Sequence, residues 1–188
     1  MQEEQKILDD CKKGNLKEFG ALYDKYVRKI YDFIFFKTYH KETAEDIASQ
    51  TFLKAVENVK NFDSRKGTFS SWLYSIARNT VIDYYRTRKF SANIEDFWDL
   101  SEENTIEEDI DRKENLEKIK AHLSKLTSAQ REIIIMRVWQ EMSYAEMAEI
   151  LGKSEESCRM MFCRTLAKLK SEMPLALFIL LLIKIIWI

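Results

Sequence analysis

The sequence predicts an all-α protein of two small helical domains joined by an acidic linker, with a short apolar C-terminal tail. Its 188 residues include only one proline and four glycines, and 46% are hydrophobic. That share is enough to bury a core in each domain. Leu, Ile, Lys and Glu are abundant, and no alternating Val/Thr run indicates a strand.

Charge is distributed unevenly along the chain, although the formal net charge is only −1. Residues 1–91 carry 17 Lys and Arg against 13 Asp and Glu, residues 92–123 carry 4 against 11, and residues 124–188 carry 9 against 7. Such changes of sign indicate separate modules. Four segments are therefore expected: a first domain at 1–91, the acidic linker at 92–115, a second domain at 116–173 and the tail at 174–188.

Two amphipathic helices are predicted early in the first domain. Asn15 with Glu18 forms a capping-box pattern before residues 16–40, and Thr43 with Asp46 opens a helix at residues 44–62. Apolar residues recur in both at helical spacing. The expected buried positions are Leu22, Tyr26, Ile30, Phe33 and Ile34 in the first helix, and Ile47, Phe52, Leu53, Val56 and Val59 in the second.

A third helix, residues 69–88, mixes aromatic and basic side chains. Six cations but only one carboxylate, Asp83, lie between Arg65 and Lys89. Aromatic faces stack on unpaired bases for roughly 1–3 kcal/mol each, while Lys and Arg hold the backbone. The segment predicts binding of a single nucleic-acid strand, with an ordinary core helix and a solvated basic face as the alternative. Three residues are expected to be scaffold: Trp72, Leu73 and Ile76.

The acidic linker is not expected to form its own core. Nine carboxylates and no basic residue lie between Glu95 and Asp111, and the few apolar residues there follow no sustained period. A solvated spacer is therefore the simplest interpretation of this segment.

The second domain contains two capping boxes and a tight turn. Thr127 with Gln130 precedes REIIIMRVW, and Ser143 with Glu146 precedes MAEIL. A Gly152-Lys153 turn then leads to Ser154, which can cap the next helix. Two helices joined by a short glycine-containing turn predict a helix-turn-helix, with a purely structural hairpin as the alternative. The second helix directs four cations outward: Arg159, Arg164, Lys168 and Lys170.

No catalytic, cofactor or metal-binding pattern stands out in the sequence. His40 and His122 are isolated, and no Gly-rich loop could hold phosphates. Cys158 and Cys163 would project about 140° apart on one helix, which does not suit a shared metal. We therefore expect no enzyme, no cofactor and no metal. The sparse cysteines and the absence of a signal-peptide layout predict the cytoplasm.

The tail, PLALFILLLIKIIWI, departs from the rest of the chain. Thirteen of the fourteen residues from Leu175 to Ile188 are apolar, Lys184 being the exception. Fourteen helical residues reach about 21 Å, which is short of the ~30 Å hydrocarbon core of a membrane. Three interpretations stay open: insertion into the inner leaflet, packing in a hydrophobic groove of this protein or a partner, and truncation of a longer membrane extension.

Three motifs in order resemble the extracytoplasmic-function (ECF) group of the sigma-70 family. EDIASQTFLKA is similar to region 2.2, GTFSSWLYSIARNTVIDYYRTRK to regions 2.3 and 2.4, and LTSAQREIIIMRVWQEMSYAEMAEILGKS to region 4. The resemblance implies an alternative sigma factor that binds RNA polymerase core, directs it to specific promoters and melts the minus-10 element, without catalytic activity of its own.

The resemblance also implies roles for single residues. Docking on the clamp coiled coil of the largest polymerase subunit would use Asp46, Gln50, Thr51, Phe52 and Lys54. A loop that takes a flipped minus-10 base would comprise Asn61, Phe62, Asp63, Ser64, Arg65 and Lys66. The helix that reads this element would use Arg78, Asn79, Asp83 and Arg86. The minus-35 major groove would receive Ser154, Arg159, Met160, Cys163 and Arg164.

The implied partners are RNA polymerase core, promoter DNA and an anti-sigma factor, with membrane contact through residues 175–188 as one interpretation of the tail. The acidic linker would thread toward the polymerase active-site cleft, where negative charge mimics nucleic acid. Ser49, Glu156 and Met161 depart from the residues common in the family. The residues alone leave two rival functions open: a dimeric helix-turn-helix regulator that binds duplex DNA, and a membrane-tethered helical adaptor.

Overall fold

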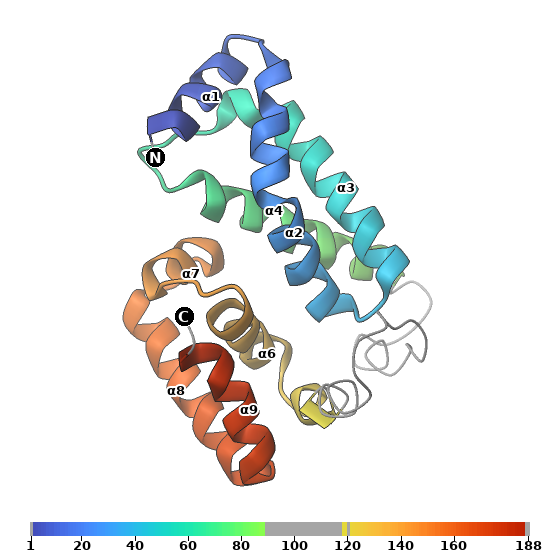
Figure 1. Ribbon diagram of the computed structural model, residues 1–188, viewed down its shortest axis with the longest axis vertical. Helices are drawn as coiled ribbons and strands as arrows, with labels where there is room; N and C mark the ends of the chain where they lie inside the picture. Colours follow the sequence, from blue (N-terminus) through green and yellow to red (C-terminus); the bar gives the residue numbers. More distant parts are fainter. Residues whose placement is uncertain (1, 89–117, 120, 187–188) are drawn as a thin grey trace. The chain divides into compact units, whose positions relative to one another are not determined.

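A computed structural model describes residues 2–88, 118–119 and 121–186 of the chain (Figure 1). The described residues form helices and connecting turns, with no β-strand among them, so the all-α prediction is confirmed. The chain divides into two compact units, residues 1–101 and 102–188. The predicted acidic linker, residues 92–115, lies outside the described residues.

The first unit packs four α-helices together. They are α1 (Gln2–Lys12), α2 (Phe19–Thr38), α3 (Lys41–Asn58) and α4 (Phe69–Arg88), with single 3-10 turns η1 (Leu16–Glu18) and η2 (Val59–Asn61). Figure 1 shows α2 and α3 side by side, with α4 crossing them. Helix α3 therefore contacts two neighbours, α2 and α4.

The buried stripes explain how these helices pack. All five positions predicted for α2 are buried, and so are Ile47, Phe52 and Val59 in the α3 region. Val56 is only half-buried, and Leu53 is 63% exposed, so the prediction for Leu53 is wrong. Leu53 is exposed because it lies on the side of α3 that neither α2 nor α4 covers.

An aromatic cluster around Phe69 fixes the start of α4. The buried Phe69 ring lies 5.6 Å from Tyr26 of α2, 5.7 Å from Phe62 and 5.6 Å from Trp72, measured between ring centroids. Aromatic pairs at such separations contribute about 0.5–1.5 kcal/mol beyond the area they bury. The cluster therefore joins α2, the loop before α4 and α4 itself.

Helix α1, which none of the sequence patterns above predicts, is held to α2 by Glu4. The Tyr26 hydroxyl donates a hydrogen bond to Glu4 Oε2 at 2.9 Å, and Lys25 forms an ion pair with the same carboxylate. Burial, followed by the bond to Glu4, raises the pKa of Tyr26 to about 12. Leu8 and Cys11, three residues apart on α1, complete the contact by entering the core.

Two predicted helix starts are wrong. Asn15 makes no side-chain capping bond, and a 3-10 turn precedes α2, because the chain leaves α1 through Gly14 at φ 99°. Helix α3 begins three residues early, at Lys41. Its cap is His40, whose Nδ1 accepts from the Thr43 backbone N–H at 3.2 Å.

The second unit contains the predicted helix-turn-helix. Its elements are α6 (Ser128–Ile134), η4 (Ile135–Trp139, a π-helical turn), α7 (Tyr144–Leu151), α8 (Glu155–Glu172) and α9 (Leu175–Ile186). Both predicted capping boxes are present, at Thr127 and Ser143. Gly152 ends α7 in the left-handed conformation at φ 62°, and Ser154 caps α8.

The centre of this unit is the run from Ile133 to Met136, in which every side chain is fully buried. Helix α6 contacts α8, while η4 contacts α9. The neighbouring Arg131 is buried too, and its Nη2 donates to the carbonyl oxygens of Ser124 and Leu126 at 3.1 and 2.9 Å. Arg131 therefore joins α6 to the turn that precedes it.

The described part of the tail is α9, which packs on its own unit. Leu177, Phe178 and Leu181 are buried and the helix contacts η4 and α8, whereas Ile179 and Leu180 are exposed. Of the three interpretations of the tail, the described residues show packing in a groove of this protein. Within the described ranges, no helix is long and apolar enough to cross a membrane.

Replacing Phe178 by Ala is expected to lower the free energy of unfolding by about 3 kcal/mol, because it removes a ring that is only 6% exposed. Ile179→Ala, one residue along the same helix at 45% exposure, is the matched control and is expected to change it by less than about 1 kcal/mol. Urea unfolding of the full chain, followed by circular dichroism, measures both. Equal losses would contradict the packing of α9.

Candidate nucleic-acid interface

Helix α3 presents a row of exposed side chains that we call the α3 ridge. Its members are Asp46, Ser49, Gln50, Leu53 and Glu57. They recur at spacings of three and four residues, so they lie on one side of the helix. Leu53 is a large apolar side chain at the centre of this otherwise polar row, which is typical of a contact surface for another protein.

Thr51 and Phe52, predicted to bind the same partner, lie in the core instead. Thr51 is fully buried and its Oγ1 donates to the Ile47 carbonyl oxygen at 2.7 Å, while the Phe52 ring lies 4.8 Å from that of Tyr23. A helix turns by about 100° per residue, so consecutive residues cannot all share one face. These two side chains stabilise the fold, which corrects the prediction.

Lys54, also predicted for polymerase docking, faces α4. Its Nζ donates to Thr80 Oγ1 at 3.1 Å and lies 3.9 Å from Asp83 Oδ2. Asp83 in turn pairs with Arg86 at 3.2 Å. The three charged groups thus link the side of α3 next to the ridge with the exposed side of α4.

Beside Lys54, the two helices and Asn61 of η2 line an open pocket of about 300 Å³, which we call the α3–α4 hollow. It is lined by Lys54, Asn58, Asn61, Trp72, Ile76, Asn79 and Thr80. Trp72 and Ile76 supply apolar surface, while three amide side chains can both donate and accept hydrogen bonds. An apolar surface with a few polar groups around it suits a planar heterocycle such as a nucleobase.

The loop that follows η2 is held by an internal ion pair. Arg65 Nε and Nη2 donate to the two Asp63 carboxylate oxygens at 2.9 and 2.8 Å, and the Arg65 backbone N–H donates to Oδ1 at 3.1 Å. These bonds hold the pKa of Asp63 well below its usual range. Asn61, Ser64 and Lys66 are exposed around this pair.

Phe62, predicted to contact a flipped base, is buried and belongs to the aromatic cluster of the core. Lys12 Nζ of α1 covers its ring at 5.3 Å. A direct contact of this ring with DNA would require the cluster to open. Phe62 therefore supports the loop from beneath, which corrects the prediction.

On α4, the residues predicted to contact DNA differ in how far they are exposed to solvent. Asn79 and Arg86 are exposed and Asp83 is half-exposed, and their spacing places all three along one side of the helix. Arg78 is half-buried. The predicted strand-binding helix thus keeps a polar and charged side toward solvent.

The aromatic residues of α4 are mostly structural. Phe69 and Tyr74 are buried, the Tyr84 hydroxyl lies 3.2 Å from Thr43 Oγ1, and the Tyr85 hydroxyl donates to the Lys37 carbonyl oxygen at 3.3 Å. Trp72 is half-buried and lines the hollow. Of the aromatic residues of α4, only Trp72 lines the hollow and could offer a surface to a base there.

Helix α8 exposes most of the residues predicted for duplex DNA. Arg159, Met160, Cys163 and Arg164 are all exposed; Met160, Cys163 and Arg164 lie away from the buried side of the helix, whereas Arg159 lies on its flank. The Ser154 hydroxyl is engaged as the helix cap, accepting from the Ser157 backbone N–H at 3.2 Å. Ser154 thus holds the end of α8 in place.

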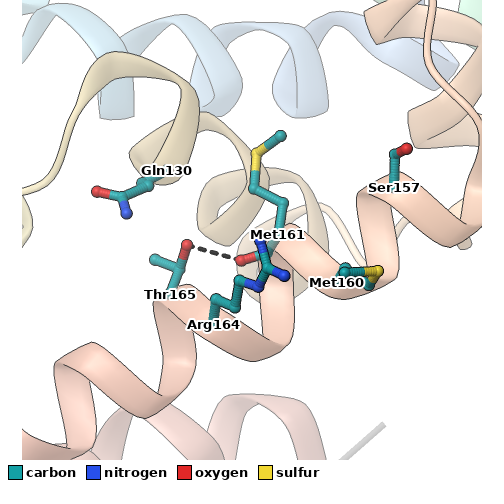
Figure 2. Close-up of a pocket in the computed structure, with 6 residues that line it drawn as sticks. All are labelled: Gln130, Ser157, Met160, Met161, Arg164 and Thr165. Atoms are coloured by element: carbon teal, nitrogen blue, oxygen red, sulfur yellow. Dashed lines mark hydrogen bonds between the residues drawn. The ribbon is translucent and has the colours of Figure 1, made fainter.

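A second pocket of about 370 Å³ lies between α8 and the start of α6 (Figure 2). It is lined by Gln130, Ser157, Met160, Met161, Arg164 and Thr165. Thr165 Oγ1 donates to the Met161 carbonyl oxygen at 2.8 Å, as Figure 2 shows. The hydroxyl of Thr165 is thereby satisfied within the helix, and Arg164 is the charged group of this pocket.

Sequence reasoning did not assign several residues to these sites: Asn58, Trp72, Ile76 and Thr80 in the lining of the α3–α4 hollow, and Gln130, Ser157, Met161 and Thr165 in the pocket beside α8. A helical spacing of four relates Lys54 to Asn58 and Trp72 to Ile76, but only the packing of α3 on α4 brings the two pairs together. Among the residues that the structure describes, no group of His, Cys, Asp and Glu could hold a metal ion.

Two family models match this chain: Sigma-70 region 2 at residues 22–91 and Sigma-70 region 4 at residues 116–169. The RNA polymerase sigma factor YlaC of Bacillus subtilis is 32% identical over 161 residues, covering 81% of this chain and 90% of YlaC. The ECF RNA polymerase sigma factor BldN of Streptomyces coelicolor is 30% identical over 175 residues, covering 89% of this chain but only 65% of BldN.

Two solved structures share the fold. CnrH in complex with the cytosolic domain of CnrY gives a TM-score of 0.70 at 23% identity, covering 90% of this chain and 96% of CnrH. The sigma factor RpoE in complex with the anti-sigma factor NepR from Bartonella quintana gives 0.63 at 23% identity, covering 82% of this chain and 96% of RpoE.

Asp63 is expected to stay ionised when the pH is lowered from 7 to 4, because Arg65 stabilises the carboxylate and lowers its pKa. The stabilisation that this ion pair contributes is therefore present above the unfolded-state pKa and is lost only as the pH falls through the lower folded-state pKa. NMR titration of the carboxyl carbon measures it. In Arg65→Ala the pKa is expected to rise toward the ordinary range, because the side-chain bonds are lost while the backbone N–H of residue 65 remains; an unchanged titration would exclude the side-chain pairing as its cause.

Proposed function

Because this chain belongs to the ECF group of the sigma-70 family of RNA polymerase sigma factors, we propose that its α3 ridge binds core polymerase while the α3–α4 hollow captures an unpaired promoter base. The protein directs polymerase to specific promoters. A free-standing helix-turn-helix regulator would leave the region 2 match at residues 22–91 without a role. The proposed action is recognition and strand separation, with no catalytic group of its own.

The observation that carries the proposal is the arrangement of two surfaces on α3. The ridge residues and the hollow residues of α3 lie roughly a quarter turn apart on the same helix. A partner bound along the ridge would therefore leave the hollow accessible. One helix can thus join polymerase to the opened strand without the two ligands competing for the same side chains.

The hollow has the chemistry to hold a base of the minus-10 element. Extruding a base costs a few kcal/mol, and stacking on one aromatic face returns roughly 1–3 kcal/mol. Trp72 supplies that face, and Asn58 and Asn79 can hydrogen-bond to the base edge. Stacking together with these hydrogen bonds would offset the free-energy cost of extruding the base, and the hydrogen bonds would make binding depend on which base it is.

Cations around the hollow would hold the strand. Lys66 and Arg86 are exposed on the loop and on α4, and Arg65 remains largely solvent-accessible while paired with Asp63. Phosphate contacts of this kind fix the register of a strand without reading its sequence. In this proposal they place the extruded base at the mouth of the hollow.

Helix α8 is the proposed minus-35 reader. Its exposed Met160 can contact a thymine methyl group, and Arg164 can donate to guanine. The exposed carboxylates of Glu155 and Glu156 at its N-terminal end would repel phosphate, but they can accept from cytosine amino groups. The structural cap at Ser154 holds this end of the helix in place.

An anti-sigma factor is the proposed regulatory partner. Two proteins of the same fold, CnrH and RpoE, are solved in complexes, the latter with an anti-sigma factor. The exposed Leu53 on the α3 ridge offers such a partner an apolar anchor that core polymerase would also need. Competition for this ridge would keep the sigma factor inactive while its partner is bound.

Leu53→Asp is expected to weaken binding to core polymerase at least about tenfold, because a charge replaces the apolar centre of the ridge. Leu16→Asp makes the same change at a leucine of η1 that is 44% exposed and lies outside the ridge, and is expected to bind normally. Fluorescence anisotropy of labelled protein with purified core measures both. Similar affinities for the two variants would remove the ridge from the polymerase contact.

Asn79→Ala is expected to reduce open-complex formation about tenfold on a promoter selected by transcribing a fragment library with wild-type holoenzyme. On a template already melted at the minus-10 element, the variant holoenzyme should still bind more weakly than wild type, since the lost contact is to the extruded base. Asn15→Ala, an exposed asparagine without a capping bond, is the control. Permanganate footprinting gives the readout, and normal opening by Asn79→Ala would contradict base capture in the hollow.

A further inference from the structure

Tyr144, the first residue of α7, is contacted by two arginines from different elements. Arg137 of η4 places its guanidinium carbon 5.0 Å from the centre of the Tyr144 ring, and Arg159 of α8 places its own at 5.4 Å. The Phe162 ring supports Tyr144 at 6.3 Å. We call Arg137, Tyr144 and Arg159 the Arg-Tyr-Arg cluster.

Neither arginine of the cluster is neutralised within the described part of the chain. No ion pair to a carboxylate is formed by Arg137 or Arg159 there. The nearby Glu146 carboxylate is engaged elsewhere, accepting from the Ser143 N–H and hydroxyl at 2.8 Å each. The ring attracts both cations but leaves their full charge in place.

The cluster also restrains both side chains. Arg137 Nη1 donates to the Met142 carbonyl oxygen at 2.6 Å, which fixes one end of this guanidinium while the ring covers it. Arg159 is exposed and rests on the same ring. Two guanidinium groups that are held in place and lack an anion present donors suited to a phosphate.

The position of the cluster indicates that the phosphate belongs to a DNA backbone. In a helix-turn-helix the second helix enters the major groove while the first crosses the DNA backbone. Arg159 lies on the flank of α8 that faces α7, about a quarter turn from the outward-facing Met160. The cluster thus occupies the junction of the two helices, where a backbone strand would pass.

We propose that Tyr144 is a positioning residue that holds Arg137 and Arg159 together as a clamp for the DNA backbone beside the groove that α8 enters. This inference rests on the proposed minus-35 contact of α8. It assigns Arg159 to phosphate, adds Arg137 as a second contact, and leaves sequence reading to Met160 and its neighbours.

The test measures the affinity of reconstituted holoenzyme for a promoter fragment over a series of salt concentrations. Arg159→Gln is expected to lower the slope of log K against log salt by about one, and to weaken native and minus-35-scrambled fragments by the same factor. Lys170→Gln, three turns further along α8, is the matched charge control and should leave the slope unchanged. An unchanged slope in Arg159→Gln would overturn the phosphate assignment.

The positioning role is tested on the ring itself. Tyr144→Phe keeps the aromatic face and is expected to bind within about twofold of wild type, while Tyr144→Leu is expected to lose roughly fivefold to tenfold. In the Tyr144→Leu background, Arg159→Gln should cost less than it does alone, because that arginine is no longer held. Equal affinity of the folded Phe and Leu variants, or full additivity with Arg159→Gln, would overturn the proposal.

Failure of this inference is distinguishable from failure of the proposed function. If wild-type holoenzyme binds native and minus-35-scrambled fragments equally, the role of α8 itself is refuted. If it discriminates between them and all cluster variants behave as wild type, only the clamp is refuted. Thermal unfolding of each variant identifies any that do not fold, and Tyr144→Phe with Arg159→Gln then still carries the test.

Discussion

Burial of the Phe69 ring is the interaction on which the first unit depends. The ring joins α2 through Tyr26, the loop through Phe62 and α4 through Trp72, so three segments far apart in sequence meet at one point. Phe69 is also the first residue of α4, and Thr68 before it caps the helix, its hydroxyl accepting from the Ser71 backbone N–H at 3.1 Å. Packing of Phe69 against Phe62 and Trp72 holds the loop in place and positions the Trp72 ring that lines the hollow.

The same packing gives α3 its two exposed surfaces. Contacts with α2 bury one side of the helix, the Lys54 bonds to α4 define a second, and the α3 ridge is what remains exposed. The hydroxyl contacts of Tyr84 and Tyr85 fasten α4 to α2 and α3. The ridge proposed for polymerase and the hollow proposed for a base therefore lie on adjacent faces of α3 because of how two helices share one core.

The second unit is organised around the buried run from Ile133 to Met136, which forms the centre of its core. Helix α8 covers one side of this run and α9 covers another, so the apolar tail extends the core. With its inner face buried, α8 is rigid enough to present Met160 and Arg164 at fixed positions. The Arg-Tyr-Arg cluster adds a restrained pair of charges at the edge of that face.

The sequence by itself determined the fold class, the helix-turn-helix and the family, because these depend on composition and on signals within a few residues of each other. The capping boxes at Thr127 and Ser143 are of this local kind. Only the tertiary structure decided that Thr51, Phe52 and Phe62 are core, that Lys54 faces α4, and that the tail packs inward. The face a side chain occupies depends on which distant helix covers it, and helical periodicity in one segment does not specify its neighbours.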